Sequence, residues 1–115
     1  MTDLFTATAT PTPTGVLVRF AGQLDADTAP RARQVVADLA LSRGALLVLD
    51  LGALEFCDSS GISVLLAARN AATAADAGIA LVAVPARLSR TFALIGLDGV
   101  FATYATVADA VAAWS

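Results

Sequence analysis

Two kinds of hydrophobic pattern alternate along the chain. Segments with apolar residues at every second position, or with unbroken apolar runs, are typical of strands, and a repeat near 3.6 residues is typical of helices. Residues 4–15 alternate Thr and Ala and then meet Pro11, Pro13 and Gly15, which predicts an edge strand followed by a turn. An unstructured tail is the alternative for this segment. Residues 15–24 predict a second strand that forms a hairpin with the first.

Helical periodicity predicts four helices in the rest of the chain. The first lies within residues 25–44, with Asp27 or Thr28 as its cap, Pro30 in its first turn and Gly44 as its stop. The others are predicted over residues 62–77, 85–97 with Gly96 as the stop, and 106–115 with Thr106 as the cap. The positions expected to face the core are Ala32, Val35, Val36 and Leu39; Ile62, Leu65, Leu66 and Ala72; Leu88, Phe92 and Ile95; and Val107, Val111 and Trp114.

Apolar runs between these helices predict three further strands. Residues 45–54 and 78–84 are almost entirely apolar, as expected for strands buried on both faces, and residues 99–105 predict a last strand. Strands that alternate with helices favour parallel crossovers. The expected fold is therefore α/β, with a single mixed sheet that begins as an antiparallel hairpin, continues with parallel strands and is covered by about four helices. Residues 1–115 are expected to form one domain.

Composition and charge exclude several classes of protein. The chain is 57% hydrophobic and 15% charged, which argues against disorder. No apolar run is long enough to span a membrane, and no N-terminal stretch resembles a signal peptide, so we expect a cytoplasmic protein without direct membrane insertion. The net charge is −3 and the seven basic residues, all Arg, are scattered, which argues against nucleic-acid binding. A single Cys cannot form an internal disulfide.

The segment Cys57–Gly61, with the sequence CDSSG, gathers most of the polar chemistry. It follows a predicted strand, and sites in parallel sheets lie beyond the carboxyl ends of strands. The chain has no His and no Lys, so a serine nucleophile would lack its usual base, and the pattern is not the G-x-S-x-G of hydrolases. Cys57 also lacks a His partner and is expected to be a small buried hydrophobe. We therefore expect no enzyme, no metal site and no cofactor.

The same segment can instead begin a helix or accept a modification. Asp58 or Ser59 can cap the helix that follows, and Gly61 allows a close approach to a neighbouring segment. An exposed Ser at a helix N-terminus can also accept a phosphate, because the helix dipole and the free N–H groups there tolerate negative charge. A partner docked on that surface would meet the added charge and bind less well.

Three segments of the sequence together resemble the anti-sigma-factor antagonists, which are small bacterial STAS domains. They are VRFAGQLDADTA over residues 18–29, LLVLDLGALEFCDSSGISVLLAARNAA over residues 46–72, and PARLSRTFALIGLDGVF over residues 85–101. They occur in the family's order and at its spacing. The resemblance implies a STAS fold and a binding protein that switches partners.

The resemblance also implies a mechanism and assigns residues to it. An anti-sigma factor that is a serine kinase would phosphorylate Ser59. The unphosphorylated antagonist would bind that kinase and release the sigma factor, the phosphorylated form would not bind, and a serine phosphatase would reset the switch. Asp58 would support the phosphosite, Ser60 and Gly61 would shape its loop, and Asp25 would lie near the same surface.

Helical spacing extends this surface beyond the motif. A row of small side chains runs along one side of the second helix, and we expect it to be the docking surface together with residues 25–27. The alternative is an ordinary solvated, alanine-rich face. The residues concerned are Ser59, Ser63, Ala67, Asn70 and Ala74 in the row, and Asp25, Ala26 and Asp27 beside it.

The sequence departs from the family pattern in places, and a second function stays open. Gln23 stands where Glu is common, which removes a charge from the expected interface, and Cys57 and Ile62 are apolar variants around the motif. The alternative function is that of an unphosphorylated STAS subunit in an ABC-type phospholipid transporter.

Overall fold

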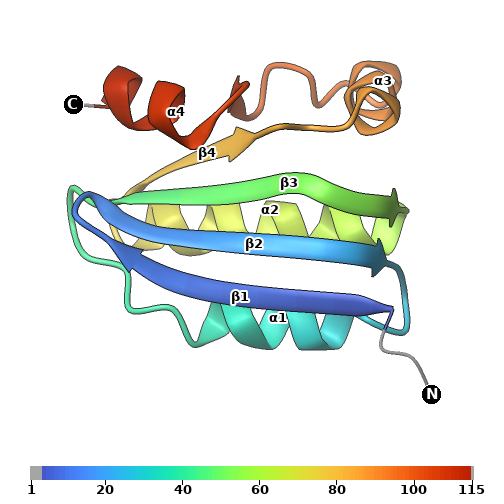
Figure 1. Cartoon of the computed structure of the whole chain (residues 1–115), viewed down its shortest axis with the longest axis horizontal. Coiled ribbons are helices and arrows are strands. Elements are labelled where there is room, and N and C mark those ends of the chain that lie inside the picture. The colour runs from blue at the N-terminus through green and yellow to red at the C-terminus, as the bar shows by residue number, and fades with distance from the viewer. Residues whose placement is uncertain (1–3, 115) are drawn as a thin grey trace.

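The computed structural model describes residues 4–114 and contains one five-stranded sheet with four helices (Figure 1). The strands lie in the order β1-β2-β3-β4-β5, with β1 and β2 antiparallel and every later neighbour parallel. This arrangement confirms the predicted fold class, including the edge position of the first strand. In chain order the elements are β1 (Phe5–Thr12), β2 (Gly15–Leu24), α1 (Ala29–Ala37), β3 (Leu46–Cys57), α2 (Ser59–Ala74), β4 (Gly78–Val82), α3 (Ala86–Leu94), β5 (Ala102–Tyr104) and α4 (Val107–Trp114).

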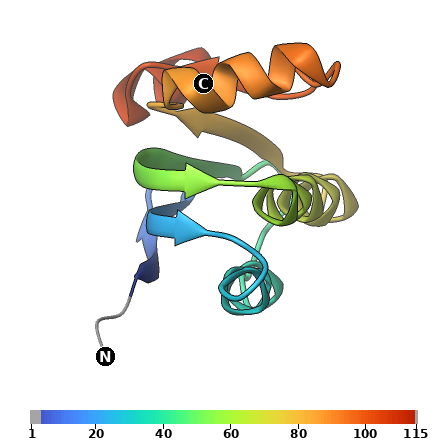
Figure 2. The same ribbon diagram turned by 90° about the vertical axis from the view of Figure 1, so that its right-hand side faces the viewer.

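Strand β3 forms the centre of the core because both of its faces are covered. Leu47, Leu49 and Leu51 face the main core with α1 and α2, whereas Leu46 and Val48 belong to a second cluster with α4. The two-sided burial explains the unbroken apolar run in the sequence. Figure 2 shows α1 and α2 side by side on one face of the sheet.

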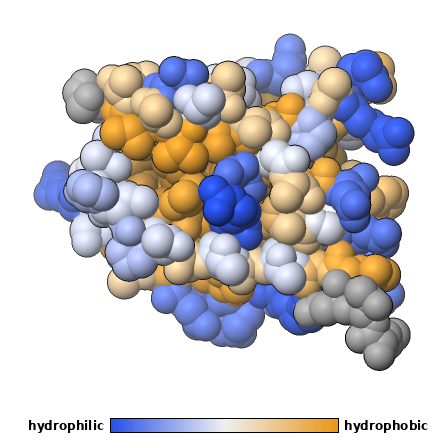
Figure 3. Space-filling model, in the orientation of Figure 1, coloured by the Kyte–Doolittle hydropathy of each residue, from blue (hydrophilic) through white to orange (hydrophobic). Residues whose placement is uncertain are grey.

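The opposite face of the sheet is covered only in part. Helix α4 contacts β3, β4 and β5, and among the described residues no helix lies over β1 and β2 on this side. Figure 3 shows hydrophobic side chains gathered toward α4 and hydrophilic side chains near the centre of this face. The ion pair between Arg19 and Asp50, at 3.1 Å, lies on β2 and β3.

The ends of β2 and β3 lie together at one edge of the molecule. Leu24 is paired with Cys57, and the Asp58 N–H donates to the Leu24 carbonyl at 3.3 Å. The pairing of β3 with β4 ends earlier, at Asp50 and Val82, so the last part of β3 projects beyond β4. This edge therefore carries the β2–α1 loop, the end of β3 and the start of α2.

The prediction for the first helix was wrong at its end. Helix α1 stops at Ala37 rather than near Gly44, and Asp38 is its C-cap. Residues 39–45 form an irregular connection from which Leu39 and Leu41 still pack against the core. Gly44 turns this connection with a φ of +80°, and its N–H donates to the Asp76 carbonyl. Core-facing apolar residues therefore continue past the end of α1, although the chain there is no longer helical.

Two core predictions near the C-terminus were also wrong. Ile95 is 54% exposed because it is the C-cap of α3, and the chain then turns at Gly96 with a φ of +81°. The partly buried Leu97 packs against the core in its place, and its N–H donates to the Phe92 carbonyl at 2.8 Å. Trp114 is 44% exposed, although its Nε1 donates to the Gly44 carbonyl at 3.2 Å.

Other boundaries agree more closely. Thr106 does cap α4, since its Oγ1 accepts from the Asp109 N–H at 3.1 Å. The last strand spans only Ala102–Tyr104, which is shorter than predicted. Ser115, the last residue of the predicted final helix, lies outside the described residues.

Candidate functional site

Asp58 is the N-cap of α2 and determines how the site is built. Its backbone is extended, with φ −98° and ψ −166°, and its Oδ1 accepts from the N–H groups of Ser60 at 2.9 Å and Gly61 at 3.2 Å. Of the two caps that the sequence allowed, Asp58 is therefore confirmed and Ser59 is excluded. Ser59 is the first residue of the helix, three positions earlier than the predicted start, and its side chain is exposed.

Gly61 allows the start of α2 to pack tightly against the strand ends. A Cβ atom at this position would lie 2.6 Å from the Cys57 Sγ, 2.9 Å from the Leu24 Cγ and 3.0 Å from the Leu24 carbonyl oxygen. Real Cβ atoms do not approach other heavy atoms so closely, so any larger residue would push the helix away from the sheet. The close approach expected from the sequence is thus confirmed.

Cys57 is a packing residue in this structure. Burial, with a smaller contribution from the negative charge of Asp58, raises the pKa of its thiol to about 12. The thiolate, which is the nucleophilic form, is therefore strongly disfavoured at neutral pH. Cys57 packs against the main core as predicted, but it is partly rather than fully buried.

The β2–α1 loop is held by several side-chain hydrogen bonds and lies beside the start of α2. The Asp25 Oδ1 accepts from the N–H groups of Asp27 at 3.0 Å and Thr28 at 3.1 Å. In return the Thr28 Oγ1 accepts from the Asp25 N–H at 2.9 Å and donates to the Gln23 carbonyl at 2.8 Å. Thr28 occupies the N-cap position of α1 but its side chain makes no capping bond, so the expected side-chain cap is absent there.

The structure places residues 25–27 and the start of α2 at one edge, whereas Ala67 and Asn70 lie further along α2. Ser63 and Ala67 are half-buried, and Asn70 and the loop residue Ala26 are exposed. The Arg33 Nη2 of α1 donates to the Ser63 Oγ at 2.7 Å, so a guanidinium lies on the row that the sequence describes as small and mildly polar. Sequence reasoning missed Arg33, although it lies one turn into α1 as Ser63 lies one turn into α2.

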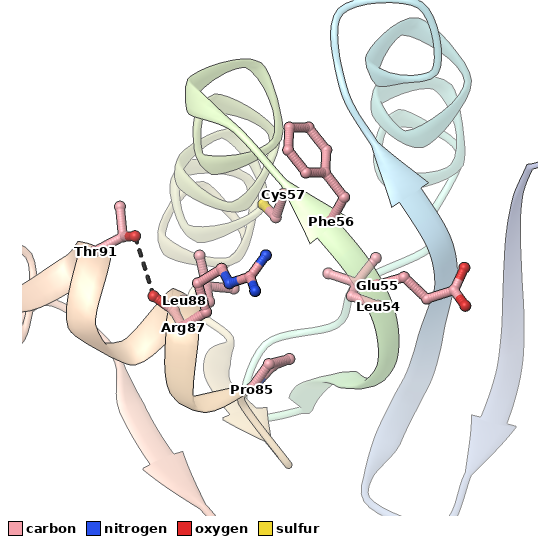
Figure 4. A pocket seen from close by; sticks show the side chains of 8 residues that line it. All are labelled: Leu54, Glu55, Phe56, Cys57, Pro85, Arg87, Leu88 and Thr91. Atoms are coloured by element: carbon pink, nitrogen blue, oxygen red, sulfur yellow. Dashed lines mark hydrogen bonds between the residues drawn. The ribbon is translucent and has the colours of Figure 1, made fainter.

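A shallow hollow lies on the other side of the strand end (Figure 4). It has a volume of about 80 Å³, far below the roughly 300 Å³ of a typical small-molecule site. Figure 4 shows the Arg87 side chain extending into the hollow and the Glu55 carboxylate pointing away from it. Its walls come from the end of β3 (Leu54, Glu55, Phe56 and Cys57) and from the start of α3 (Pro85, Arg87, Leu88 and Thr91).

The structure thus leaves the Ser59 hydroxyl exposed at the start of α2. Within residues 4–114, no group of three His, Cys, Asp or Glu side chains is placed to hold a metal ion. In the same range, no helix is both long enough and apolar enough to cross a membrane.

Comparison with known proteins assigns the family. Residues 6–110 match the model of the STAS domain. The chain belongs to the STAS family. A crystal structure of an anti-sigma factor antagonist from Mycobacterium paratuberculosis is 33% identical, with a TM-score of 0.79, over 95% of this chain and 92% of that chain. The anti-sigma-B factor antagonist of Listeria monocytogenes is 29% identical over 80 residues, which are 70% of each chain.

These relatives place the protein among the anti-sigma factor antagonists of the STAS family, which are not enzymes. More distant solved structures share the fold alone. One is the Bacillus cell fate determinant SpoIIAA in its phosphorylated form, at 21% identity and a TM-score of 0.71, over 96% of this chain and 99% of that chain.

Proposed function

We propose that this STAS protein is an anti-sigma factor antagonist whose binding is switched by phosphorylation of Ser59. The observation that carries the proposal is the exposed hydroxyl of Ser59 at the first position of α2, directly after the capping Asp58. Similarity to anti-sigma factor antagonists supports the partner, and the complete D-S-S-G motif supports the switch. The unmodified chain binds an anti-sigma factor with serine-kinase activity, and the sigma factor is released.

The switch is an electrostatic change at the start of α2, next to the carboxylate of Asp58. The kinase transfers the γ-phosphoryl group of ATP to the Ser59 Oγ, the hydroxyl proton is lost and ADP is released. The product carries about 1.5 to 2 additional negative charges at neutral pH. Asp58 directly precedes this position, and Asp25 and Asp27 lie on the adjoining β2–α1 loop. A partner that fits the uncharged hydroxyl must then desolvate and oppose a phosphate, which weakens binding.

The proposed docking surface combines the β2–α1 loop with the first turns of α2. Asp25 holds the loop through hydrogen bonds to its own N–H groups, so Ala26 and Asp27 are presented in a fixed conformation. Asp58 supports Ser59 by fixing the helix start, while Ser60 and Gly61 shape the turn that it caps. Ser63, Ala67 and Asn70 continue the surface along α2.

The chain itself performs no chemistry and needs no cofactor in this proposal. ATP belongs to the kinase, and a serine phosphatase that hydrolyses the Ser59 phosphate restores the binding form. Because sigma factors act in the cytoplasm, we expect phosphorylation, dephosphorylation and binding to take place there.

Phosphoryl transfer to the intact protein tests the proposal. We expect purified anti-sigma factor kinases and ATP to add one phosphate to the parent protein, with mass spectrometry locating it on Ser59. Ser59→Ala should abolish the transfer, whereas Ser60→Ala should retain it, because the Ser60 side chain takes no part in the cap. Transfer to Ser60 in the parent protein would overturn the assignment.

Charge and bulk on the docking surface provide a second test. Ala67→Arg should leave the fold intact, because Ala67 is half-buried at the helix surface, yet it should prevent binding of the anti-sigma factor. Normal binding by this folded variant would remove α2 from the interface. Retention of the unmodified chain by a permease and its ATPase, with no transfer by any kinase, would favour the transporter-subunit alternative.

A further inference from the structure

Arg33 places a positive charge on the helix face that begins at Ser59. Its Nη2 donates to the Oγ of Ser63, which is four residues after Ser59 in the same helix. Residues four apart in a helix are neighbours on one face, with about 5–6 Å between their Cβ atoms. A guanidinium hydrogen-bonded to Ser63 is therefore within one helical turn of Ser59.

The packing of the two helices directs this side chain toward Ser59. Helices α1 and α2 pack against each other and follow the neighbouring parallel strands β2 and β3, so both helices begin at the same edge of the sheet. Helical side chains tilt toward the N-terminus of their own helix. Arg33 therefore extends toward the edge that carries Ser59.

The start of α2 offers little else to balance a phosphate. Asp58 already occupies the N–H groups of Ser60 and Gly61, which would otherwise be donors for an anion at this helix end. The other charged side chains on the adjoining loop, Asp25 and Asp27, are acidic. A phosphate at Ser59 thus adds negative charge next to Asp58 and near an acidic loop, so a cation on the same helix face would stabilise it.

We propose that Arg33 is the internal partner of the phosphate on Ser59. The inference rests on the proposed function, because it concerns the phosphorylated state of that site. On phosphorylation the guanidinium leaves Ser63 and pairs with the phosphate oxygens, to which the planar arginine side chain can donate two parallel hydrogen bonds. In this account phosphorylation changes the docking surface at two positions, because it adds a phosphate at Ser59 and removes Arg33 from Ser63.

The ionisation of the phosphate measures this contact directly. Phosphoserine is installed at position 59 during translation with an expanded genetic code, so that no kinase is needed, and the second pKa of the phosphate is followed by phosphorus NMR. Pairing with a cation stabilises the dianion and lowers this pKa. From the usual strength of an exposed ion pair, we expect the pKa to be about 0.3–0.7 unit lower in the parent than in Arg33→Gln.

Matched variants separate a local contact from a change in net charge. Arg90→Gln removes the same charge from an exposed position on α3 and should leave the phosphate pKa as it is in the parent. Arg33→Lys returns the charge and should restore at least half of the shift. Circular dichroism verifies that each variant is folded.

If the phosphate pKa were equal in the parent, Arg33→Gln and Arg90→Gln, the proposal that Arg33 pairs with the phosphate would be overturned. That result would leave the proposed function untouched, because phosphoryl transfer and partner binding are measured separately. Conversely, a clear effect of Arg33→Gln with no kinase able to modify Ser59 would establish the ion pair and remove the proposed switch.

Discussion

Replacing Asp58 with Ala removes the side chain that holds the first turn of α2. The Oδ1 of Asp58 accepts from two N–H groups, at 2.9 Å from Ser60 and 3.2 Å from Gly61. Loss of an N-cap side chain costs about 0.5–2 kcal/mol of stability. Gly61 is buried, so water replaces the lost acceptor poorly there, and we place the loss in the upper half of this range, at about 1.5 kcal/mol.

This loss can be read from thermal or urea unfolding followed by circular dichroism. For a domain of this size, about 1.5 kcal/mol lowers the midpoint temperature by roughly 6 °C. Asp58→Asn keeps an acceptor oxygen and should recover most of the loss, but not the favourable interaction of the charge with the helix dipole.

Asp27→Ala is the matched control because it removes the same carboxylate from a neighbouring exposed position. The N–H of Asp27 bonds to Asp25 through the backbone, so this bond survives the substitution. A surface change of this kind should alter stability by no more than about 0.5 kcal/mol. If Asp58→Ala and Asp27→Ala unfolded at the same midpoint as the parent, the capping role derived from the geometry would be wrong.

Four further predictions test the packing around the site and at the opposite end of the molecule. Gly61→Ala should lower the free energy of unfolding, measured by urea denaturation, by about 1–3 kcal/mol, because the new methyl group overpacks the junction of helix and sheet. Gly99→Ala, with no atom within 4 Å of the new Cβ, should be nearly neutral. Equal stability of the two variants would contradict the close approach at Gly61. At mildly alkaline pH the partly buried Cys57, whose thiol pKa is raised to about 12, should react with a disulfide reagent much more slowly in the native protein than in the unfolded protein, and equal rates would contradict its packing. The raised thiol pKa also implies that the stability of the parent relative to Cys57→Ala is constant below the ordinary thiol pKa of 9.0 and falls as the pH rises from there toward about 12, since only the unfolded thiol then releases its proton. Gly78→Ala should displace the Trp114 ring, which would lie 2.4 Å from the added Cβ, and should shift the tryptophan fluorescence to longer wavelength; an unchanged spectrum would contradict this packing.

The fold could be predicted because each element has a local signal in the sequence. The apolar run of β3 indicates burial on both faces, and Pro30 and Thr106 mark the starts of α1 and α4. The end of α1 could not be predicted in this way. Leu39 and Leu41 reach the core from an irregular connection, and over so few residues apolar spacing does not distinguish that connection from a further helical turn.

At the candidate site, too, the sequence predicts local features but not contacts between distant segments. The motif offered Asp58 or Ser59 as the cap of a helix predicted to begin at Ile62, and only the hydrogen bonds decide that Asp58 is the cap and that the helix begins at Ser59. Arg33 could not be assigned to the site from spacing along the chain, because it is 30 positions from Ser63 and reaches it through the packing of two helices.

The affinity of an anti-sigma factor for the two forms of Ser59 tests the central claim most directly. Isothermal titration calorimetry would compare the parent protein with the protein that carries phosphoserine at position 59, under identical salt conditions. Opposed like charges at an interface cost several kcal/mol, so the account predicts binding by the parent and at least about 100-fold weaker binding by the phosphorylated form. Equal affinity of the two forms would contradict it.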